Sequence, residues 1–190
     1  MNPGSALSAA WIVWLVSWLA AAGWSNPTVS RPGRHREIPY RVTVMIGTVL
    51  LFGWFPAYRS SQQLLWQTGN TLGWLMFATA VAGLLFTWWA RITLGKLWSG
   101  DVTRKESHEV VDRGPYALVR HPIYTGIILA SFATAVMAGT VTAFVGAAIM
   151  TFSWYIKARL EESFLRDQLG RENYDTYARR VPMLFPFLGK

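Results

Sequence analysis

Two polar stretches that border a long apolar run carry the residues best suited to chemistry. The first stretch ends in Arg120-His121-Pro122-Ile123-Tyr124. Pro122 predicts the start of a helix, because the missing N–H of proline would be unpaired in a first turn and its fixed φ is already helical. The N-terminus of that helix, with Arg120 and His121 beside it, is a candidate site for a carboxylate or a phosphate group. On these residues alone, an interfacial anchor is the alternative interpretation.

The second stretch follows the apolar run and carries the acidic pair Glu161 and Glu162. This pair lies about one helical turn beyond Ile156, the last residue of the run. Carboxylates at that level are well placed to bind a cationic ligand at a membrane surface. The alternative is a solvated helix face, because Glu162 and Arg166 have a spacing at which an ion pair contributes only a few tenths of a kcal/mol. Gly170 is expected to end this helix.

The composition indicates one membrane domain with an all-α fold. The chain has 190 residues, 52% of them hydrophobic, with 11 tryptophans and no cysteine. Disulfide bonds, a cysteine nucleophile and a thiolate metal site are therefore excluded, and no metal site is expected. The net charge of +8 agrees with basic loops that face anionic lipid headgroups, so no nucleic-acid partner is needed to explain it.

Long uncharged runs predict the transmembrane helices. Residues 6–24, 42–58 and 71–90 are each close to the roughly 20 residues that a membrane span needs. A fourth run, residues 123–156, is too long for one span and is expected to break near residues 137–140 into a helical hairpin. The sequence therefore predicts five transmembrane helices. We interpret residues 1–190 as a single membrane domain, with three spans in 1–90, a polar insert in 91–122, the hairpin in 123–156 and a polar tail in 157–190.

Positive charges predict the orientation of these helices. Of the 18 Lys and Arg residues, all except Arg59 lie in three segments, residues 25–41, 91–120 and 157–190. With five spans these three segments share one side, which the positive-inside rule assigns to the cytoplasm. A four-span fold would place the second and third segments on opposite sides. We therefore expect a multi-pass protein of a bacterial or archaeal inner membrane, with its N-terminus outside and its site facing the cytoplasm.

Several motifs follow one another in a specific order. They are Gly114-Pro115-Tyr116-Ala117-Leu118-Val119-Arg120-His121-Pro122-Ile123-Tyr124-Thr125-Gly126, then Glu161-Glu162, then Leu169-Gly170-Arg171-Glu172-Asn173-Tyr174-Asp175-Thr176-Tyr177, then Arg180-Val181-Pro182. No single motif is decisive, but together they resemble the isoprenylcysteine carboxyl methyltransferase family and its prokaryotic relatives. The resemblance covers residues 94–186.

The resemblance implies an integral-membrane methyltransferase that uses S-adenosylmethionine in a cytoplasm-facing pocket and has no Rossmann domain. The absence of a G-x-G-x-x-G motif after a predicted strand agrees with this. The implied substrate is lipid-like or prenylated, with a carboxylate such as that of a prenylcysteine as the methyl acceptor. Such a carboxylate is already ionised at neutral pH, so the enzyme has to orient it and exclude water but needs no general base.

Carried over position by position, the resemblance gives roles to individual residues. Lys157 stands where prenylcysteine-methylating relatives tend to have an arginine near the substrate, and a lysine binds a carboxylate as a point charge. Lys157 and Arg120 are the candidate catalytic residues. Two other interpretations of Arg120 are that it binds a lipid phosphate headgroup, or that it stabilises the insert by an ion pair with Glu109 or Asp112. The implied cofactor-binding residues are His108, Glu109, Val110, Val111, Tyr116, His121, Pro122, Ile123, Tyr124, Glu161 and Glu162, with Glu161 as the foremost carboxylate.

Three other functions stay open on the sequence. A phospholipid N-methyltransferase would act on an amine that must first lose a proton. Membrane sterol and steroid reductases also resemble the family around a His-Pro-x-Tyr-x-Gly segment, but they use a nicotinamide cofactor. A non-catalytic membrane protein could keep the cofactor-binding fold as a scaffold or a sensor.

Overall fold

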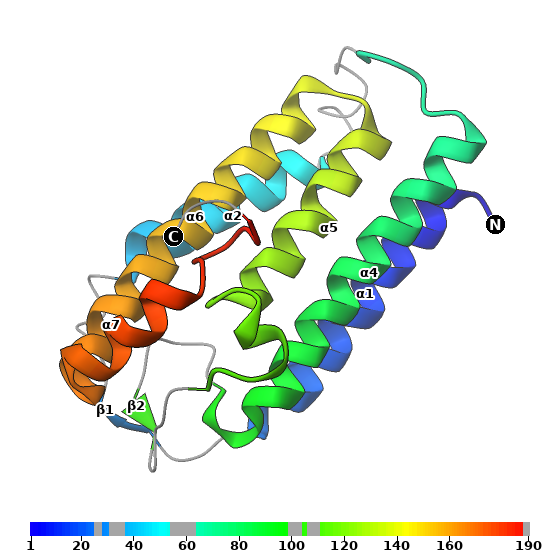
Figure 1. The fold of residues 1–190 in the computed structure, drawn as a ribbon. Coiled ribbons are helices and arrows are strands. Elements are labelled where there is room, and N and C mark those ends of the chain that lie inside the picture. Colours follow the sequence, from blue (N-terminus) through cyan, green and yellow to red (C-terminus); the bar gives the residue numbers. More distant parts are fainter. Residues whose placement is uncertain (25–27, 31–36, 54–63, 99–103, 106–110, 188–190) are drawn as a thin grey trace.

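The computed structural model of the protein describes residues 1–24, 28–30, 37–53, 64–98, 104–105 and 111–187. Six α-helices account for most of this part of the chain (Figure 1). The expected all-α fold is confirmed. The α-helices are α1 Pro3–Ala20, α2 Ile38–Phe52, α4 Asn70–Leu94, α5 Pro122–Ala138, α6 Val141–Leu169 and α7 Arg171–Arg180, and the short 3-10 helices are η1 Ala21–Gly23, η3 Gly95–Leu97 and η4 Gly114–Ala117.

Five of these helices are apolar and follow the five predicted runs, so the protein is an all-α membrane protein. Pro3–Gly23, Asn70–Leu97 and Val141–Asp167 are each long and apolar enough to cross a membrane. The apolar helices α2 and α5 are shorter, with 15 and 17 residues. Apolar side chains of α1 face outward, and Val13, for example, is 67% exposed. A surface of this kind is suited to contact with lipid chains.

The turn between α5 and α6 lies where the sequence predicted a break. Gly139 adopts a φ of 65° and ends α5, and its N–H donates to the carbonyl oxygen of Ala135 at 3.0 Å. Thr140 begins α6, because its hydroxyl oxygen accepts a hydrogen bond from the Ala143 N–H at 3.2 Å. A Cβ at Gly139 would lie 2.5 Å from the Trp66 carbonyl oxygen, so glycine is needed for space as well as for its backbone angle. The predicted hairpin is confirmed.

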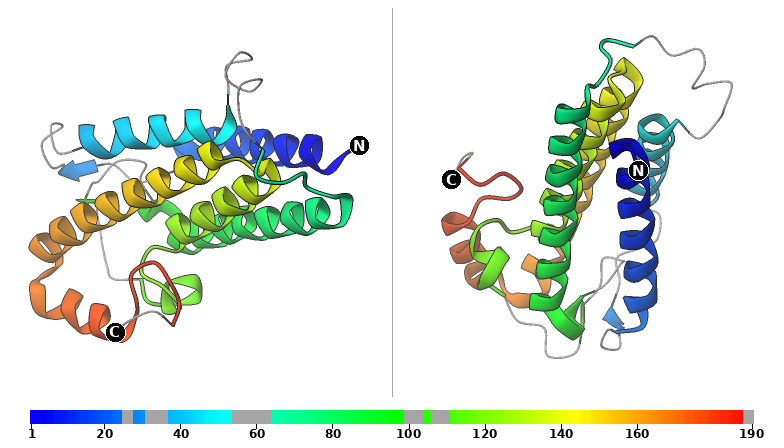
Figure 2. Two further views of the ribbon diagram at one scale, coloured as in Figure 1. Left: turned by 90° about the horizontal axis from the view of Figure 1, so that it is seen from above. Right: turned by 90° about the vertical axis from the view of Figure 1, so that its right-hand side faces the viewer.

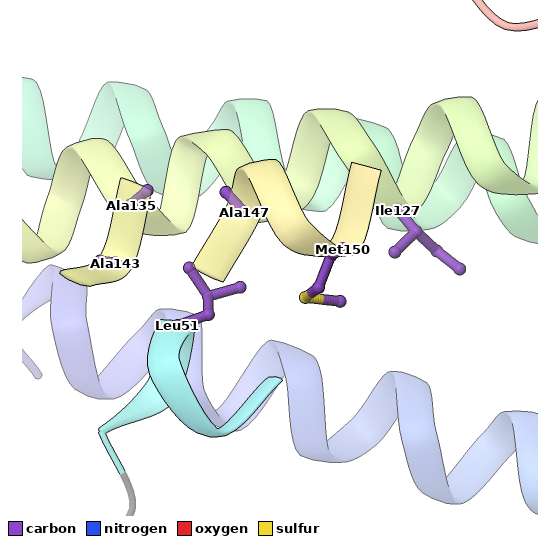
Figure 3. Close-up of a cluster of buried hydrophobic side chains, with 6 residues drawn as sticks. All are labelled: Leu51, Ile127, Ala135, Ala143, Ala147 and Met150. Carbon is purple, nitrogen blue, oxygen red and sulfur yellow. The ribbon is translucent and has the colours of Figure 1, made fainter. Parts of the chain in front are cut away.

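Two glycine pairs bring neighbouring helices into close contact. A Cβ at Gly83 of α4 would lie 2.6 Å from the carbonyl oxygen of Gly126 in α5. A Cβ at Gly146 of α6 would lie 2.7 Å from the carbonyl oxygen of Gly47 in α2. Helices in membranes associate through such small-residue contacts, which let two backbones approach closely. The buried side chains that fill the space between α2, α5 and α6 (Figure 3) are Leu51, Ile127, Ala135, Ala143, Ala147 and Met150.

Polar connections gather at one end of the helix bundle, opposite the α5–α6 turn (Figures 1 and 2). Strands β1 (Thr28–Ser30) and β2 (Arg104–Lys105) form a small antiparallel ladder there and join the α1–α2 connection to the insert. The all-α prediction missed this ladder because strands of this length carry no alternating pattern. The backbone N–H of Arg120 donates to the Pro182 carbonyl oxygen at 2.9 Å and joins the insert to the tail. The described parts of the three basic segments therefore meet at one end, as a fold with five membrane-spanning helices requires.

Candidate functional site

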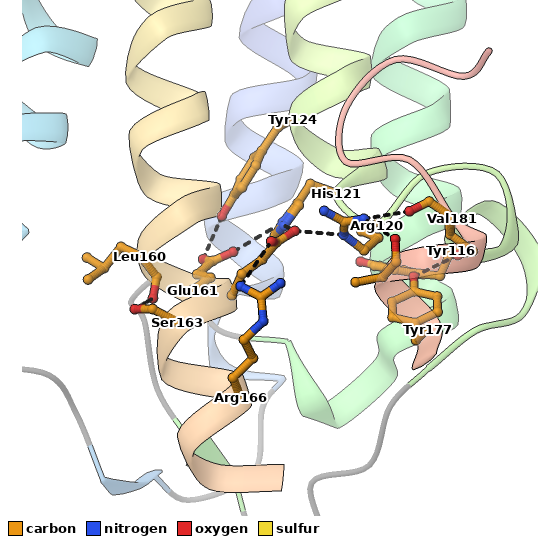
Figure 4. A network of polar contacts seen from close by, with 12 residues as sticks. Tyr116, Arg120, His121, Tyr124, Leu160, Glu161, Ser163, Arg166, Tyr177 and Val181 are labelled. Atoms are coloured by element: carbon orange, nitrogen blue, oxygen red, sulfur yellow. Dashed lines mark hydrogen bonds and ion pairs between the residues drawn. The ribbon is translucent and has the colours of Figure 1, made fainter. Parts of the chain in front are cut away.

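Two neighbouring acidic residues of α6 form the centre of the site (Figure 4). The side chain of Glu162 is 1% exposed, and its Oε1 accepts a hydrogen bond from Arg120 Nε at 2.7 Å. The same oxygen lies 3.2 Å from His121 Nε2, and Oε2 lies 3.8 Å from Arg166 Nη1. A carboxylate removed from water is costly unless cations and hydrogen bonds compensate for the lost hydration. Glu162 finds these partners within the protein itself.

Glu161 is the more accessible carboxylate, with 20% of its side chain exposed. The hydroxyl of Tyr124 donates to its Oε1 at 2.6 Å. His121 Nδ1 lies 3.5 Å from its Oε2, and Lys157 Nζ lies 3.9 Å from its Oε1. Glu161 is therefore fixed in place by its neighbours and still keeps a surface that a ligand can reach.

His121 bridges the two carboxylates and is itself buried. Its Nδ1 faces Glu161 and its Nε2 faces Glu162. Burial alone would lower the pKa of His121, but hydrogen bonds to the two glutamates and their negative charge outweigh burial and hold the pKa above its ordinary value. An imidazolium donates from both ring nitrogens, so this geometry fits a protonated His121.

The raised pKa of His121 makes the stability of the protein depend on pH. Stabilisation by protonated His121 is fully present below its ordinary pKa of about 6.5 and is lost as the pH rises through the raised pKa. We expect the difference in melting temperature between the wild type and His121→Gln to be largest at or below about pH 6.5 and to shrink at higher pH. Thermal unfolding in detergent between about pH 6 and 9 measures this difference. A difference that stays constant over the range would contradict a charged His121.

Aromatic rings line the space beside the carboxylates. The rings of His121 and Tyr124 stack with centroids 5.4 Å apart, and those of Tyr124 and Trp154 stack at 5.0 Å. Lys157 Nζ lies 5.5 Å from the ring centroid of Tyr124 and 5.8 Å from that of Trp154. It also lies 5.4 Å from the ring centroid of Tyr40, and a cation within about 6 Å of a ring centroid is attracted to the ring. The Lys157 ammonium group is thus held where α2, α5 and α6 meet.

The tail closes over the start of α5. Arg120 Nη1 donates to the carbonyl oxygen of Val181 at 2.6 Å. The backbone N–H groups of Arg120 and His121 donate to the carbonyl oxygens of Pro182 and Met183 at 2.9 and 3.0 Å. These bonds connect the insert, the carboxylate cluster and the tail in one structure.

The partners of Arg120 differ from those considered on the sequence. Its carboxylate partner is Glu162, whereas Asp112 pairs with Arg180 at 3.3 Å. Glu109 lies outside the described residues. Arg120 and Glu162 are 42 positions apart in the chain. The sequence alone therefore gave no reason to prefer Glu162 over acidic residues that are closer to Arg120 in the sequence.

Tyr116 is a further residue of the predicted cofactor site that the structure describes in the insert. Its ring is buried in η4, and burial, followed by the negative charge of Glu161, raises its pKa, so the phenol is uncharged. Its carbonyl oxygen accepts a hydrogen bond from the Tyr177 hydroxyl at 2.7 Å. Of the remaining predicted residues, Pro122 and Ile123 form the first turn of α5, Val111 is partly exposed, and His108, Glu109 and Val110 lie outside the described residues.

Tyr40 and Trp154 belong to this constellation but were not predicted. Trp154, Lys157 and Glu161 recur at spacings of three and four, which places them on one face of α6. Helical spacing therefore offered a signal for Trp154. Tyr40 comes from α2, and nothing in its sequence neighbourhood marks it.

A sequence model of the isoprenylcysteine carboxyl methyltransferase (ICMT) family matches residues 74–167. This range ends within the polar tail, at residue 167, and it includes most of the residues whose contacts define the cluster. They are Arg120, His121, Tyr124, Trp154, Lys157, Glu161 and Glu162.

Three kinds of protein are represented among the similar curated proteins. Protein-S-isoprenylcysteine O-methyltransferase B of Arabidopsis thaliana is 32% identical over 102 residues, which are 52% of this chain and 51% of the plant protein. Methanethiol S-methyltransferase of Crocosphaera subtropica is 43% identical over 75 residues, which are 40% of this chain and 28% of that protein. Nickel-cobalt-cadmium resistance protein NccN of Alcaligenes xylosoxydans xylosoxydans is 31% identical over 121 residues, which are 60% of this chain and 53% of that protein. The chain spans about half the length of these relatives or less. With the family match, these similarities make the chain a relative of the isoprenylcysteine carboxyl methyltransferase family.

Proposed function

We propose that this chain is a membrane methyltransferase that transfers a methyl group from S-adenosylmethionine to the carboxylate of a lipid-like acceptor such as a prenylcysteine. One observation carries the proposal: Glu161, a partly exposed carboxylate, is held by Tyr124 and faces Lys157 within the region that matches the family. The name of the Arabidopsis thaliana relative, a protein-S-isoprenylcysteine O-methyltransferase, supports a carboxyl acceptor.

The charges of the cluster fit this methyl donor. S-adenosylmethionine would supply a methyl group on a positively charged sulfur, next to an amino group and a carboxylate. Glu161 offers a negative charge to the positive groups, and the π electrons of the neighbouring Tyr124 and Trp154 attract a cation as well. Protonated His121, at the start of α5, offers positive charge to the donor's carboxylate. We assign to the donor the predicted set His108, Glu109, Val110, Val111, Tyr116, His121, Pro122, Ile123, Tyr124 and Glu161, with Glu162 acting through Arg120 and His121.

Lys157 is the residue that we assign to the acceptor. Its ammonium group is almost fully buried and lies beside Tyr40 and Tyr124. An ammonium group there stabilises an acceptor carboxylate as a point charge, and no side chain has to remove a proton because the carboxylate is ionised at neutral pH. Arg120, held by Glu162 and the tail, is a positioning residue in this proposal. The chain's main task is then to orient the acceptor and to exclude water.

A small thiol is the second candidate acceptor. The methanethiol S-methyltransferase of Crocosphaera subtropica is 43% identical over 75 residues, compared with 32% over 102 residues for the Arabidopsis protein. A thiol must be ionised before it attacks a methyl group, and a neighbouring ammonium group lowers the pKa of a thiol. Lys157 would therefore serve this reaction as well.

Turnover with defined acceptors tests the proposed function. Purified protein in detergent is incubated with methyl-labelled S-adenosylmethionine and, in separate reactions, with N-acetyl-S-farnesylcysteine, methanethiol or phosphatidylethanolamine. We expect label to reach the carboxylate of the prenylated cysteine. Transfer to the thiol alone would reassign the protein to S-methylation, and transfer only to an amine-headed lipid would reassign it to phospholipid methylation. Binding of a reduced nicotinamide nucleotide, with no binding of S-adenosylmethionine, would reject methyl transfer.

We also propose that the site faces the cytoplasm of a bacterial or archaeal cell, with the N-terminus on the other side of its inner membrane. The described parts of the three basic segments lie at one end of the bundle, and segments rich in Lys and Arg are retained in the cytoplasm. Because the chain has no cysteine, the exposed positions in Ser5→Cys and Arg179→Cys can be labelled separately. An impermeant maleimide added to intact spheroplasts should label position 5 and not position 179, and the opposite pattern would reverse the orientation.

A further inference from the structure

Arg91 lies in the last turn of α4 and is completely buried, with 0% of its surface exposed. Charged side chains are almost never buried in full unless a group of opposite charge accompanies them. No carboxylate of the described residues forms an ion pair with Arg91. Among the described residues, Arg91 forms its hydrogen bond with Ala21 and packs on Trp18, Trp88 and Trp98, none of which belongs to the Glu161 and Glu162 cluster. Its burial therefore needs a separate explanation.

Three tryptophans enclose the guanidinium group of Arg91. Its Cζ lies 3.4 Å from the ring centroid of Trp98, 4.9 Å from that of Trp18 and 6.0 Å from that of Trp88. A guanidinium group is weakly hydrated and stacks well on aromatic rings. All three rings are themselves partly exposed. The positive charge is thus covered by a single layer of side chains.

The hydrogen bonds of this guanidinium group are incomplete. Its Nη2 donates to the carbonyl oxygen of Ala21, whereas Nε and Nη1 have no acceptor among the described residues. A nearby polar pair between α1 and α4 is satisfied, since Trp14 Nε1 donates to the Thr87 hydroxyl oxygen at 2.7 Å. A buried donor without an acceptor is unfavourable, and more so when it is charged. Aromatic packing accounts for the three rings but leaves these N–H groups unpaired, and an oxyanion would accept hydrogen bonds from them and balance the charge.

The location indicates which oxyanion this is. Arg91 lies where a membrane-spanning helix ends, at the end of the bundle that carries the basic segments, and the exposed Lys96 follows it in η3. Tryptophan and arginine at this level meet lipid headgroups, and basic pockets between helices bind headgroup phosphates. We propose that Arg91, whose guanidinium group is held by the rings of Trp18, Trp88 and Trp98, binds the phosphate of an anionic membrane lipid, at a site distinct from the methyltransferase site. The fork of the guanidinium group matches the oxygens of a phosphate.

A lipid titration tests this site on the unmodified protein. Wild-type protein in a phosphate-free maltoside detergent is titrated with dihexanoylphosphatidylglycerol while the melting temperature is followed. We expect a saturable rise of about 4 °C or more, because a ligand that binds only the folded state stabilises it. Inorganic phosphate and decanoate, titrated in the same way, probe for a free phosphate and for a carboxylate. A rise with the lipid alone supports the proposal, whereas an equal rise with either probe, or no saturable rise, overturns it.

A matched pair of variants locates the effect at Arg91. Arg91→Gln should abolish the rise, and Lys96→Gln, which removes one exposed positive charge nearby, should retain it. Equal loss in both variants would show unspecific attraction and overturn the assignment. If Arg91→Gln does not fold, Arg91→Lys takes its place, because it keeps the charge and loses the planar fork. We then expect the lipid concentration at half-saturation to increase about tenfold, and an unchanged value would equally overturn the proposal.

Discussion

Glu161→Gln is expected to weaken the binding of S-adenosylmethionine by about 1 to 3 kcal/mol, or about 5- to 150-fold in Kd. The substitution keeps the size of the side chain and removes its charge, so the positive groups of the ligand lose their partner in a shielded site where charges interact more strongly than in water. Tyr124 can still donate to the amide oxygen, which preserves the local structure. Isothermal titration calorimetry on the detergent-purified protein measures the change.

Two further substitutions make this result specific. Glu172→Gln removes the same charge from an exposed position of α7 and should leave Kd unchanged. Glu162→Gln should instead lower the free energy of unfolding by about 3 kcal/mol or more, because Arg120 and His121 lose a buried counter-charge. If Glu161→Gln binds S-adenosylmethionine with unchanged affinity, and a stable Glu162→Gln protein binds it more weakly, then Glu162 and not Glu161 is the carboxylate that contacts the donor.

Lys157→Met is expected to lower kcat/KM for a carboxylate acceptor by about tenfold or more, with a smaller effect on the affinity for S-adenosylmethionine. Methionine has a similar length and no charge, so the acceptor loses a charge-assisted contact that is worth about 1.5 to 3 kcal/mol. Lys157→Arg restores the charge and adds a fork that fits a carboxylate, so it should retain activity. Steady-state kinetics with a prenylcysteine analogue at saturating methyl donor measure these effects.

The exposed Arg159 of α6 provides the control for Lys157. Arg159→Met removes a positive charge from the same helix and should leave kcat/KM unchanged. Equal losses in both variants, or full activity of Lys157→Met, would remove Lys157 from the acceptor site. If the acceptor is a thiol, the loss in Lys157→Met should diminish at high pH, where the thiol ionises without help from an ammonium group.

Short-range chemistry made several elements of the fold predictable. Pro122 begins α5 because its ring and missing N–H suit a first turn. Gly139 ends α5 and Gly170 follows the last residue of α6, both with positive φ, where glycine is favoured over other residues. Each of these features depends on the residue itself and on a few neighbours in sequence. The sequence is sufficient to predict features of that kind.

The arrangement of the site depends on long-range contacts that could not be predicted from sequence patterns. Glu161 and Glu162 are neighbours with the same chemistry, yet their side chains are 20% and 1% exposed. This difference follows from which face of α6 is covered by Arg120 and the tail. Tyr40 lies beside Lys157 and belongs to α2, which approaches α6 closely at Gly47. Such long-range packing determines which of several chemically equivalent residues is accessible to a ligand. The sequence pattern could therefore identify Glu161 and Glu162 as candidates, but it could not predict which of the two is buried.

The backbone bonds from Arg120 and His121 to Pro182 and Met183 have a consequence for biosynthesis. A ribosome makes α1 to α6 first, and these helices can enter the bilayer while the carboxylates of α6 are still uncovered. These bonds can form only when residue 183 has left the ribosome. Nascent chains and products of premature termination before that point would therefore insert into the membrane without the contacts that join the insert to the tail, so the carboxylate cluster is closed only after this residue has been made.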